Sequence, residues 1–274
     1  LAGSQPTALA LSPAGDTLYV ALGGGNLIVP FAVASGSGGL TEGMPAVSGG
    51  GVNAIAVSPD GALLAATNSA TNSVETFTLD AMTGAPTAAD SQVTGNGPTG
   101  LVFSPDSAFL YVANNTSGTI SQYAVSSPGV ITPLAPASVS SAVQTQSLAI
   151  PDGGNFLYAA NTGGSITQYQ VTGGGTLAPL ATPSVATVAG VWDIAVDAIG
   201  ETLYATNLLE QELVSYTIPA SGELLLLETV RTRSQPIALA VGPGQSAVTE
   251  RATHAFVANE EDGDVSSLLV DSNS

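Results

Sequence analysis

Side chains that could move a proton or hold an anion are few in this sequence. It contains one histidine, His254, and three arginines, Arg231, Arg233 and Arg251, all within its last 45 residues, and it has no lysine. If the chain is an enzyme, His254 is the candidate general base, and Arg231 or Arg233 would stabilise an oxyanion or a carboxylate. The alternative interpretation of His254, in the stretch ERATHAFVAN, is an ordinary loop residue.

Carboxylates also gather in this part of the chain, since 13 of the 21 Asp and Glu residues lie from Asp193 onward. In an enzyme, Glu210 or Glu212 would orient the base and the cation. Oxygen ligands in neighbouring loops can also bind calcium, the one cofactor that the sequence suggests. The candidate ligands are Glu210, Glu212, Glu260, Glu261, Asp262 and Asp264. Solvated turns, or pairing of these loops with Arg231 and Arg233, are the alternatives.

Composition excludes several classes of partner. The formal net charge of −18 repels nucleic acid and anionic lipid, whose binding depends on Lys and Arg. No apolar run approaches the ~20 residues of a membrane-spanning helix. The absence of cysteine excludes disulfides, thiolate metal sites and cysteine nucleophiles. A chain rich in Gly, Ser and Thr that lacks Lys and Cys and does not begin with Met suggests a processed, extracellular or cell-surface protein.

A repeat organises the whole chain and must position these side chains. Six copies align at Tyr19, Ala65, Tyr111, Tyr158, Tyr204 and Phe256, at spacings of 46, 46, 47, 46 and 52 residues. A second aromatic or apolar marker keeps the same step. The copies run approximately over residues 5–50, 51–96, 97–143, 144–190, 191–234 and 235–274.

Each copy contains four short β-segments. The first is apolar and small, as in TALALS; the second is of the LYVAN type; the third alternates, as in TISQYAV; and the fourth is interrupted by proline, as in ITPLAPASV. Proline lacks the backbone donor of a central strand and belongs at an edge. This pattern predicts an all-β propeller of six four-stranded blades in a single domain, with a β-solenoid as the competing architecture.

The sixth copy ends before a fourth segment, so its last strand is predicted to expose an apolar edge. The residues of this candidate interface are Val265, Ser267, Leu268, Leu269 and Val270. A partner strand could complete it, either from a second copy or from another surface protein. Pairing with the N-terminus and a truncated chain are the alternatives.

The motifs LYVAN, LYAAN and LYATN, preceded by SPDG or SPDS, resemble the YVTN-type repeat of surface-layer propellers and the related lactonase-like propellers. The resemblance covers the chain, although lactonase-like members usually have seven blades. It implies catalysis by His, Arg and Glu side chains on one face of the propeller. The first four copies contain no basic side chain, so this sequence departs from that pattern.

Two further features have alternative interpretations. Asn114 and Asn115 each begin an N-x-S/T glycosylation motif in a predicted exposed turn. Trp192, the one tryptophan, could stack on a ligand at the channel mouth or pack between blades.

The short, neutral loops favour a non-enzymatic structural or interaction module that self-assembles at its open edge. The alternatives are a lactonase-like hydrolase of a small sugar lactone and a ligand-binding propeller.

Overall fold

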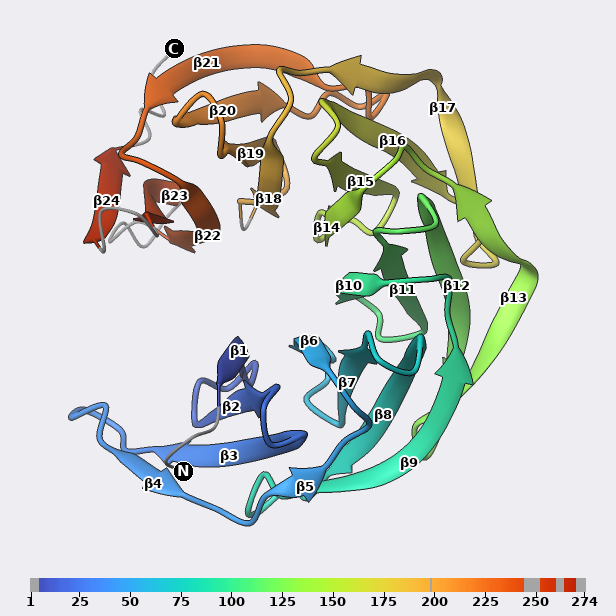
Figure 1. Cartoon of the computed structure of the whole chain (residues 1–274), viewed down its shortest axis with the longest axis vertical. Helices are drawn as coiled ribbons and strands as arrows, with labels where there is room; N and C mark the ends of the chain where they lie inside the picture. The colour runs from blue at the N-terminus through green and yellow to red at the C-terminus, as the bar shows by residue number, and fades with distance from the viewer. Residues whose placement is uncertain (1–4, 198, 244–251, 260–263, 270–274) are drawn as a thin grey trace. The chain divides into compact units, whose positions relative to one another are not determined.

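The computed structural model describes residues 5–197, 199–243, 252–259 and 264–269. All regular secondary structure in this part of the chain is β-strand, and no helix that could span a membrane occurs in it. The chain divides into two compact units, residues 1–140 and 141–274. Each unit contains three antiparallel sheets, in which strands consecutive in sequence pair with one another, except that β5 pairs with β3 (Figure 1).

The first unit holds sheets 1 to 3. Within it, the first strand of sheet 2 packs between the first strands of sheets 1 and 3. Sheet 1 consists of β1 (Pro6–Leu11), β2 (Thr17–Leu22), β3 (Leu27–Val33), β4 (Leu40–Glu42) and β5 (Ala46–Val47). Sheet 2 consists of β6 (Val52–Val57), β7 (Leu63–Asn68), β8 (Ser73–Leu79) and β9 (Pro86–Val93). Sheet 3 consists of β10 (Pro98–Phe103), β11 (Phe109–Asn114), β12 (Thr119–Ser126) and β13 (Val130–Ser140).

The second unit holds sheets 4 to 6, and the first strand of sheet 5 packs between those of sheets 4 and 6. Sheet 4 consists of β14 (Thr145–Ala149), β15 (Phe156–Asn161), β16 (Ser165–Val171) and β17 (Leu177–Ala186). Sheet 5 consists of β18 (Val191–Val196), β19 (Thr202–Asn207), β20 (Glu212–Thr217) and β21 (Leu225–Arg231). Sheet 6 consists of β22 (Pro236–Pro243), β23 (Ala252–Asn259) and β24 (Asp264–Leu269).

The predicted order of segments within each repeat is confirmed, but the predicted blade count is confirmed only in part. Five sheets have four or more strands, and the described part of sheet 6 has three, so the chain shows five full blades rather than six. The proline-interrupted segments form the outer strands β13 and β17, as expected. β24 is the last strand of sheet 6 in the described residues. It includes Val265, Ser267, Leu268 and Leu269 of the predicted interface, while Val270 lies outside the described residues.

The turn between the first two strands explains why the Ser-Pro-Asp-Gly motif recurs. In sheet 2, Ser58 Oγ accepts a hydrogen bond from the Leu63 amide at 2.9 Å, and Asp60 Oδ1 accepts one from the Ala62 amide at 3.0 Å. Gly61 adopts a φ of 72°, which a residue with a β-carbon rarely tolerates. The motif therefore closes a tight hairpin and fixes the register of the strands on either side of it.

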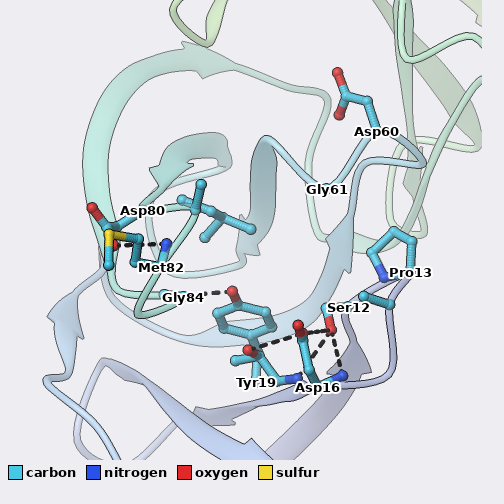
Figure 2. A pocket seen from close by; sticks show the side chains of 13 residues that line it. Ser12, Pro13, Asp16, Tyr19, Asp60, Gly61, Asp80, Met82 and Gly84 are labelled. Carbon is cyan, nitrogen blue, oxygen red and sulfur yellow. Dashed lines mark hydrogen bonds between the residues drawn. The ribbon is translucent and has the colours of Figure 1, made fainter.

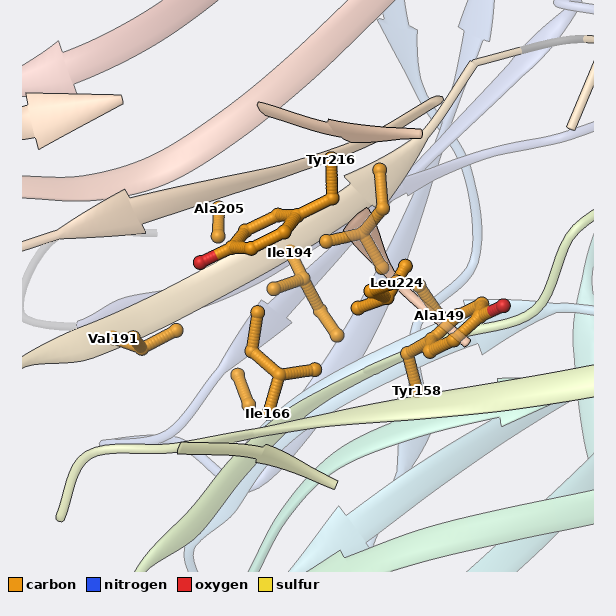
Figure 3. Packing of buried hydrophobic residues seen from close by; sticks show 10 residues of the cluster. Ala149, Tyr158, Ile166, Val191, Ile194, Ala205, Tyr216 and Leu224 are labelled. Atoms are coloured by element: carbon orange, nitrogen blue, oxygen red, sulfur yellow. The ribbon is translucent and has the colours of Figure 1, made fainter. Parts of the chain in front are cut away.

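Neighbouring sheets within a unit are held together by apolar cores. Between sheets 4 and 5, Tyr158 and Ile166 of one sheet meet Ile194, Tyr216 and Leu224 of the other (Figure 3). A single sheet would expose this surface to water, so each blade needs its neighbour.

The repeated tyrosine of the second strand adds a polar link between sheets. Tyr19 donates its hydroxyl to the Gly84 carbonyl at 2.9 Å, and Tyr158 donates to the Gly222 carbonyl at 2.8 Å. Sheet 2 has Ala65 at this position, and its cross-strand partner Thr76 makes the corresponding bond, to the next sheet's turn carbonyl, at 2.6 Å. The link is thus preserved where the tyrosine is lost.

Candidate active site

The structure places the two described arginines at the outer edge of sheet 5. Arg231 ends β21, and Arg233 follows it, and both are exposed. Since β18 and β21 are three strands apart in this sheet, roughly 14 Å separates them. Strand pairing sets Glu212 directly opposite Arg231. Arg231 therefore lies too far from β18 to contact polar groups on that strand, and the predicted catalytic role of both arginines stays a prediction.

Of the other members of the predicted catalytic set, the structure brings Glu212 to Arg231 by strand pairing and describes Glu210 elsewhere. Glu210 is exposed in the turn between β19 and β20, where its amide donates to Asn207 Oδ1 at 3.0 Å. His254 lies on β23, opposite Gly242 and Leu269, and its side chain is outside the described residues, as is Arg251. A role for His254 stays a prediction.

The predicted calcium site is only partly within view. Glu260, Glu261, Asp262 and the side chain of Asp264 lie outside the described residues. The remaining two candidates, Glu210 and Glu212, belong to no group of three or more metal-binding side chains in the described part of the chain. The calcium site therefore stays a prediction.

The expectation that Asn114 lies in an exposed turn is wrong. Its side chain is fully buried, and its amide donates to Thr119 Oγ1 at 3.1 Å and to Ser121 Oγ at 2.9 Å. A buried, hydrogen-bonded amide cannot accept a glycan in the folded chain. Asn115 is partly exposed and stays a prediction.

An open cavity of about 320 Å³ lies in the first unit, and Asp16, Asp60 and Asp80 line it (Figure 2). These carboxylates are engaged in their own turns; hydrogen bonds from Thr83 and Met82, for example, lower the pKa of Asp80. The Tyr19 hydroxyl at the same cavity is used in its bond to Gly84. The cavity is acidic and would repel anions.

Polar side chains gather on the first strands of the second unit, β14 and β18, beside irregularities in strand pairing. The register between the first and second strand of every sheet is interrupted near its start, at positions such as Thr145/Ser147 and Val191/Ile194. Such irregularities redirect side chains and are common beside active sites. In sheets 4 and 5 they present Gln146 and Ser147 on β14 and Trp192 and Asp193 on β18, all partly exposed.

Asp193 is the centre of this group. Its Oδ1 accepts hydrogen bonds from Ser147 Oγ at 2.7 Å and from its neighbour's amide, that of Ile194, at 2.9 Å. Its Oδ2 accepts one from the Leu239 amide of β22 at 2.9 Å. Burial raises the pKa of Asp193, and the hydrogen bonds from Ser147, Leu239 and Ile194 oppose that rise. One carboxylate thus joins the first strands of three neighbouring sheets.

The repeat shows that Ser147 and Asp193 are exceptional. The corresponding residues of the other sheets are Ala8, Ala54, Gly100 and Ala238. In the first unit, the links between first strands are made one residue earlier: Thr7 donates to the Val52 carbonyl at 2.8 Å, and Asn53 to the Pro98 carbonyl at 2.9 Å. Structural linkage therefore does not require a carboxylate here.

Ser147 and Asp193 were not among the catalytic candidates predicted from the sequence, because those candidates were chosen from the basic side chains and the acidic loops. The available signal was an ionisable residue at a repeat position that is otherwise Ala, Gly or Ser. Chemically, a carboxyl whose pKa is raised is a stronger base once it is ionised, and Ser147 holds it in one orientation.

The chain is similar to known proteins in sequence over its first part and in structure over nearly its whole length. Residues 2–103 match the family described as "Lactonase, 7-bladed beta-propeller". The periplasmic gluconolactonase of Pseudomonas aeruginosa has a similar structure, with a TM-score of 0.82 and 19% identity over 98% of this chain and 82% of that one. The chain has the fold of a lactonase-like β-propeller.

Other solved structures extend this similarity. A protein from Bacteroides fragilis described as a candidate 6-phosphogluconolactonase has a TM-score of 0.82 and 18% identity, over 97% of this chain and 80% of that one. A functionally unknown protein from Desulfotomaculum acetoxidans has a TM-score of 0.81 and 14% identity, over 98% of this chain and 83% of that one. No curated protein matches the sequence significantly.

These comparisons correct the functional expectation. Proteins described as lactonases contradict the leading hypothesis of a non-enzymatic, self-assembling surface module, and they favour its alternative, a lactonase-like hydrolase. They support the lactonase-like part of the resemblance seen in the sequence and give no support to the surface-layer part.

Proposed function

We propose that this chain hydrolyses small, uncharged sugar lactones, with Asp193 as the general base. The observation that carries the proposal is the Ser147–Asp193 pair, in which a 2.7 Å hydrogen bond orients a carboxyl of raised pKa at a partly exposed position on a first strand. The similarity to a structure described as a gluconolactonase supports an uncharged sugar lactone, and the similarity to one described as a candidate 6-phosphogluconolactonase supports lactones in general. The Ser and Asp at positions otherwise occupied by Ala or Gly support the location.

In the proposed reaction, the ionised Asp193 carboxylate takes a proton from a water molecule. The water oxygen attacks the carbonyl carbon of the lactone, and the ring C–O bond breaks when the tetrahedral intermediate collapses. The departing alkoxide recovers the proton from the Asp193 carboxyl, which restores the base. The product is the open hydroxy acid, and no oxidant or reductant is needed.

Ser147 acts in this scheme as a positioning residue. Its hydroxyl contacts Asp193 Oδ1, so it fixes the direction of the carboxylate and stabilises its ionised form. Trp192 precedes Asp193 on β18 and provides a flat, partly exposed surface against which a sugar ring can lie.

The charge of the chain favours an uncharged substrate over a phosphorylated one. The chain carries 21 acidic side chains and three arginines, and the first strands β14 and β18 contain no cation. A substrate phosphate near Asp193 would find no charge-assisted hydrogen bond, and the negative field of the protein would repel it.

The number of blades and the location of the protein are also part of this proposal. Six repeats over residues 5–50, 51–96, 97–143, 144–190, 191–234 and 235–274 would form six blades, the last of them with three described strands. A location outside the cytoplasm is supported by the similarity to a periplasmic protein and by a composition without Lys or Cys.

The test is hydrolysis of D-glucono-1,5-lactone by the purified chain, measured by pH-stat against the spontaneous rate. Asp193→Asn keeps the shape of the side chain and removes the base, so we expect kcat to fall by about 10²–10⁴-fold. Asp106→Asn, which changes a carboxylate in a turn of the first unit, should retain full activity. Wild-type turnover no faster than the spontaneous rate, or full activity in an Asp193→Asn variant that is folded by circular dichroism, would refute the proposal.

A further inference from the structure

The third strand of several sheets makes a polar contact with the connection that precedes its sheet. In sheet 2, the Glu75 carboxylate accepts hydrogen bonds from the Gly49 amide at 2.9 Å and from Ser48 Oγ at 2.8 Å. In sheet 3, Ser121 Oγ accepts one from the amide of Gly95 at 3.3 Å. In sheet 4, Thr167 and Ser141 share a hydroxyl–hydroxyl bond of 2.9 Å, again to the preceding connection. The contact thus recurs with different polar side chains.

Sheet 5 breaks this series. Strand pairing places Val214 at the position of Glu75, Ser121 and Thr167, since all four lie opposite the fourth residue of the second strand. Valine has no group that can bond the connection between sheets 4 and 5. The polar contact seen in the three preceding sheets is therefore lost at this position.

The tyrosine two positions after Val214, Tyr216, also differs in its hydrogen bonding from its equivalents in the preceding sheets. Tyr123 of sheet 3 donates its hydroxyl to the Val93 carbonyl at 2.6 Å, and Tyr169 of sheet 4 has hydrogen bonds through Ser141 and Thr167. The equivalent Tyr216 is 3% exposed, yet no atom in the described chain bonds its hydroxyl. Burial alone raises the pKa of Tyr216. In Figure 3 the hydroxyl points away from Leu224 and Tyr158, toward the side of the cluster where Ala205 and Val191 lie.

A cavity of about 300 Å³ lies where the contact is missing. It is bounded by the end of β17 and the following connection on one side and by β19, β20 and β21 on the other. Its walls include Val188, Val191, Glu212, Val214, Tyr216 and Leu226. The volume reaches the lower end of the range of small-molecule sites, and the lining is mainly apolar.

We propose that this cavity, called here the sheet 5 cavity, binds a small uncharged molecule with an apolar ring and one hydroxyl or carbonyl group that bonds to Tyr216. The apolar ring would pack against Val188, Val214 and Leu226. This site shares no lining residue with the Ser147–Asp193 pair, and it stands whether or not that pair is catalytic.

Charge decides against ionic ligands. Glu212 is the one charged residue among those that line the cavity, and strand pairing sets it opposite Arg231. An anion would face Glu212 in a chain of net charge −18, whereas a cation would be repelled by Arg231, which strand pairing sets opposite Glu212. A neutral molecule avoids both costs and satisfies the Tyr216 hydroxyl.

The test compares two probes of similar size, 4-fluorophenol and fluorobenzene, by fluorine NMR titration of the full chain. We expect the wild type to bind 4-fluorophenol more tightly than fluorobenzene. Tyr216→Phe removes the hydroxyl alone and should weaken 4-fluorophenol binding by about 2- to 10-fold, since one hydrogen bond is lost, while leaving fluorobenzene binding unchanged. Val214→Thr gives Tyr216 a polar neighbour like Thr167 of sheet 4, which would compete with the ligand for the Tyr216 hydroxyl. This variant should therefore also bind 4-fluorophenol more weakly than the wild type does.

A second pair of variants establishes the location. Val188 is 55% exposed at the cavity, so Val188→Trp should block it and abolish binding of both probes. Val143→Trp places the same bulk on an exposed valine in the connection before sheet 4 and should leave binding unchanged. The proposal is overturned if the wild type binds neither probe, if Tyr216→Phe keeps the preference for 4-fluorophenol, or if Val188→Trp binds as the wild type does.

Discussion

The hydroxyl of Ser147 donates a 2.7 Å hydrogen bond to Oδ1 of Asp193, across 46 positions of sequence and between the first strands of neighbouring sheets. Burial raises the pKa of Asp193, whereas this bond lowers it. The acidity of the proposed base is therefore set jointly by its enclosure and by one hydroxyl.

Replacing Ser147 with alanine tests this relationship. The change removes a bond to the ionised form of Asp193, so the pKa of Asp193 should rise and the acid limb of the kcat/KM profile should move to higher pH. We also expect kcat/KM at neutral pH to fall by about 10- to 100-fold, because one charge-assisted hydrogen bond is worth about 1.5–3 kcal/mol. Profiles of wild type and Ser147→Ala, with Ser126→Ala as an exposed control, supply the measurement. An unshifted acid limb would show that Ser147 does not control Asp193.

The raised pKa of Asp193 also predicts a pH dependence of stability. Its folded-state pKa lies above its unfolded value, so the stability that the protonated carboxyl contributes is fully present below the unfolded pKa and is lost as the pH rises through the folded pKa. Because the side-chain amide of the Asp193→Asn variant does not titrate, the free energy of unfolding of the wild type relative to this variant should decrease from acid to neutral pH. Urea unfolding between about pH 3.5 and 7 measures it. A relative stability that increases over this range would contradict the expected direction.

Tyr158 and Tyr216 allow a comparison of stability, because the hydroxyl of Tyr158 has a hydrogen-bond partner in the described chain and that of Tyr216 has none. Tyr158 donates to the Gly222 carbonyl at 2.8 Å, so Tyr158→Phe should cost about 1–3 kcal/mol by leaving a buried acceptor unpaired. Tyr216→Phe removes a hydroxyl that no atom of the described chain bonds, and it should change stability by less than about 0.5 kcal/mol. Urea unfolding of both variants gives the comparison. Equal losses would mean that Tyr216 has a structural hydrogen bond after all.

Substrate charge provides the fourth prediction. For D-glucono-1,5-lactone and its 6-phosphate, we expect kcat/KM to favour the uncharged lactone by at least about tenfold at low ionic strength, because the protein carries a net charge of −18. Salt should narrow the gap, since it screens the repulsion. Assays at two salt concentrations measure both effects. Preference for the phosphorylated lactone would reject the uncharged class while retaining lactone hydrolysis itself.

The order of strands was predictable from local chemistry. The outer position of β13 and β17 follows from their prolines, which cannot donate to a sheet ladder. The turn at Ser58 and Asp60 follows from hydrogen bonds that span a few residues. Such features depend on neighbours in sequence, so a repeat of 46 or 47 residues displays them several times over.

Burial and pairing across the sheets were decided only by the tertiary structure. The motif at Asn114 suggests an exposed turn, yet packing against the preceding connection buries its amide beside Ser121. Asp193 appears in the sequence as a polar residue in an apolar strand, at the repeat position that Ser147 occupies in the preceding copy. The sequence does not show that these two side chains bond or that Asp193 accepts a hydrogen bond from the Leu239 amide. Those contacts form because sheets stacked side by side bring the same repeat position of different copies together, where one changed side chain alters the acidity of the next.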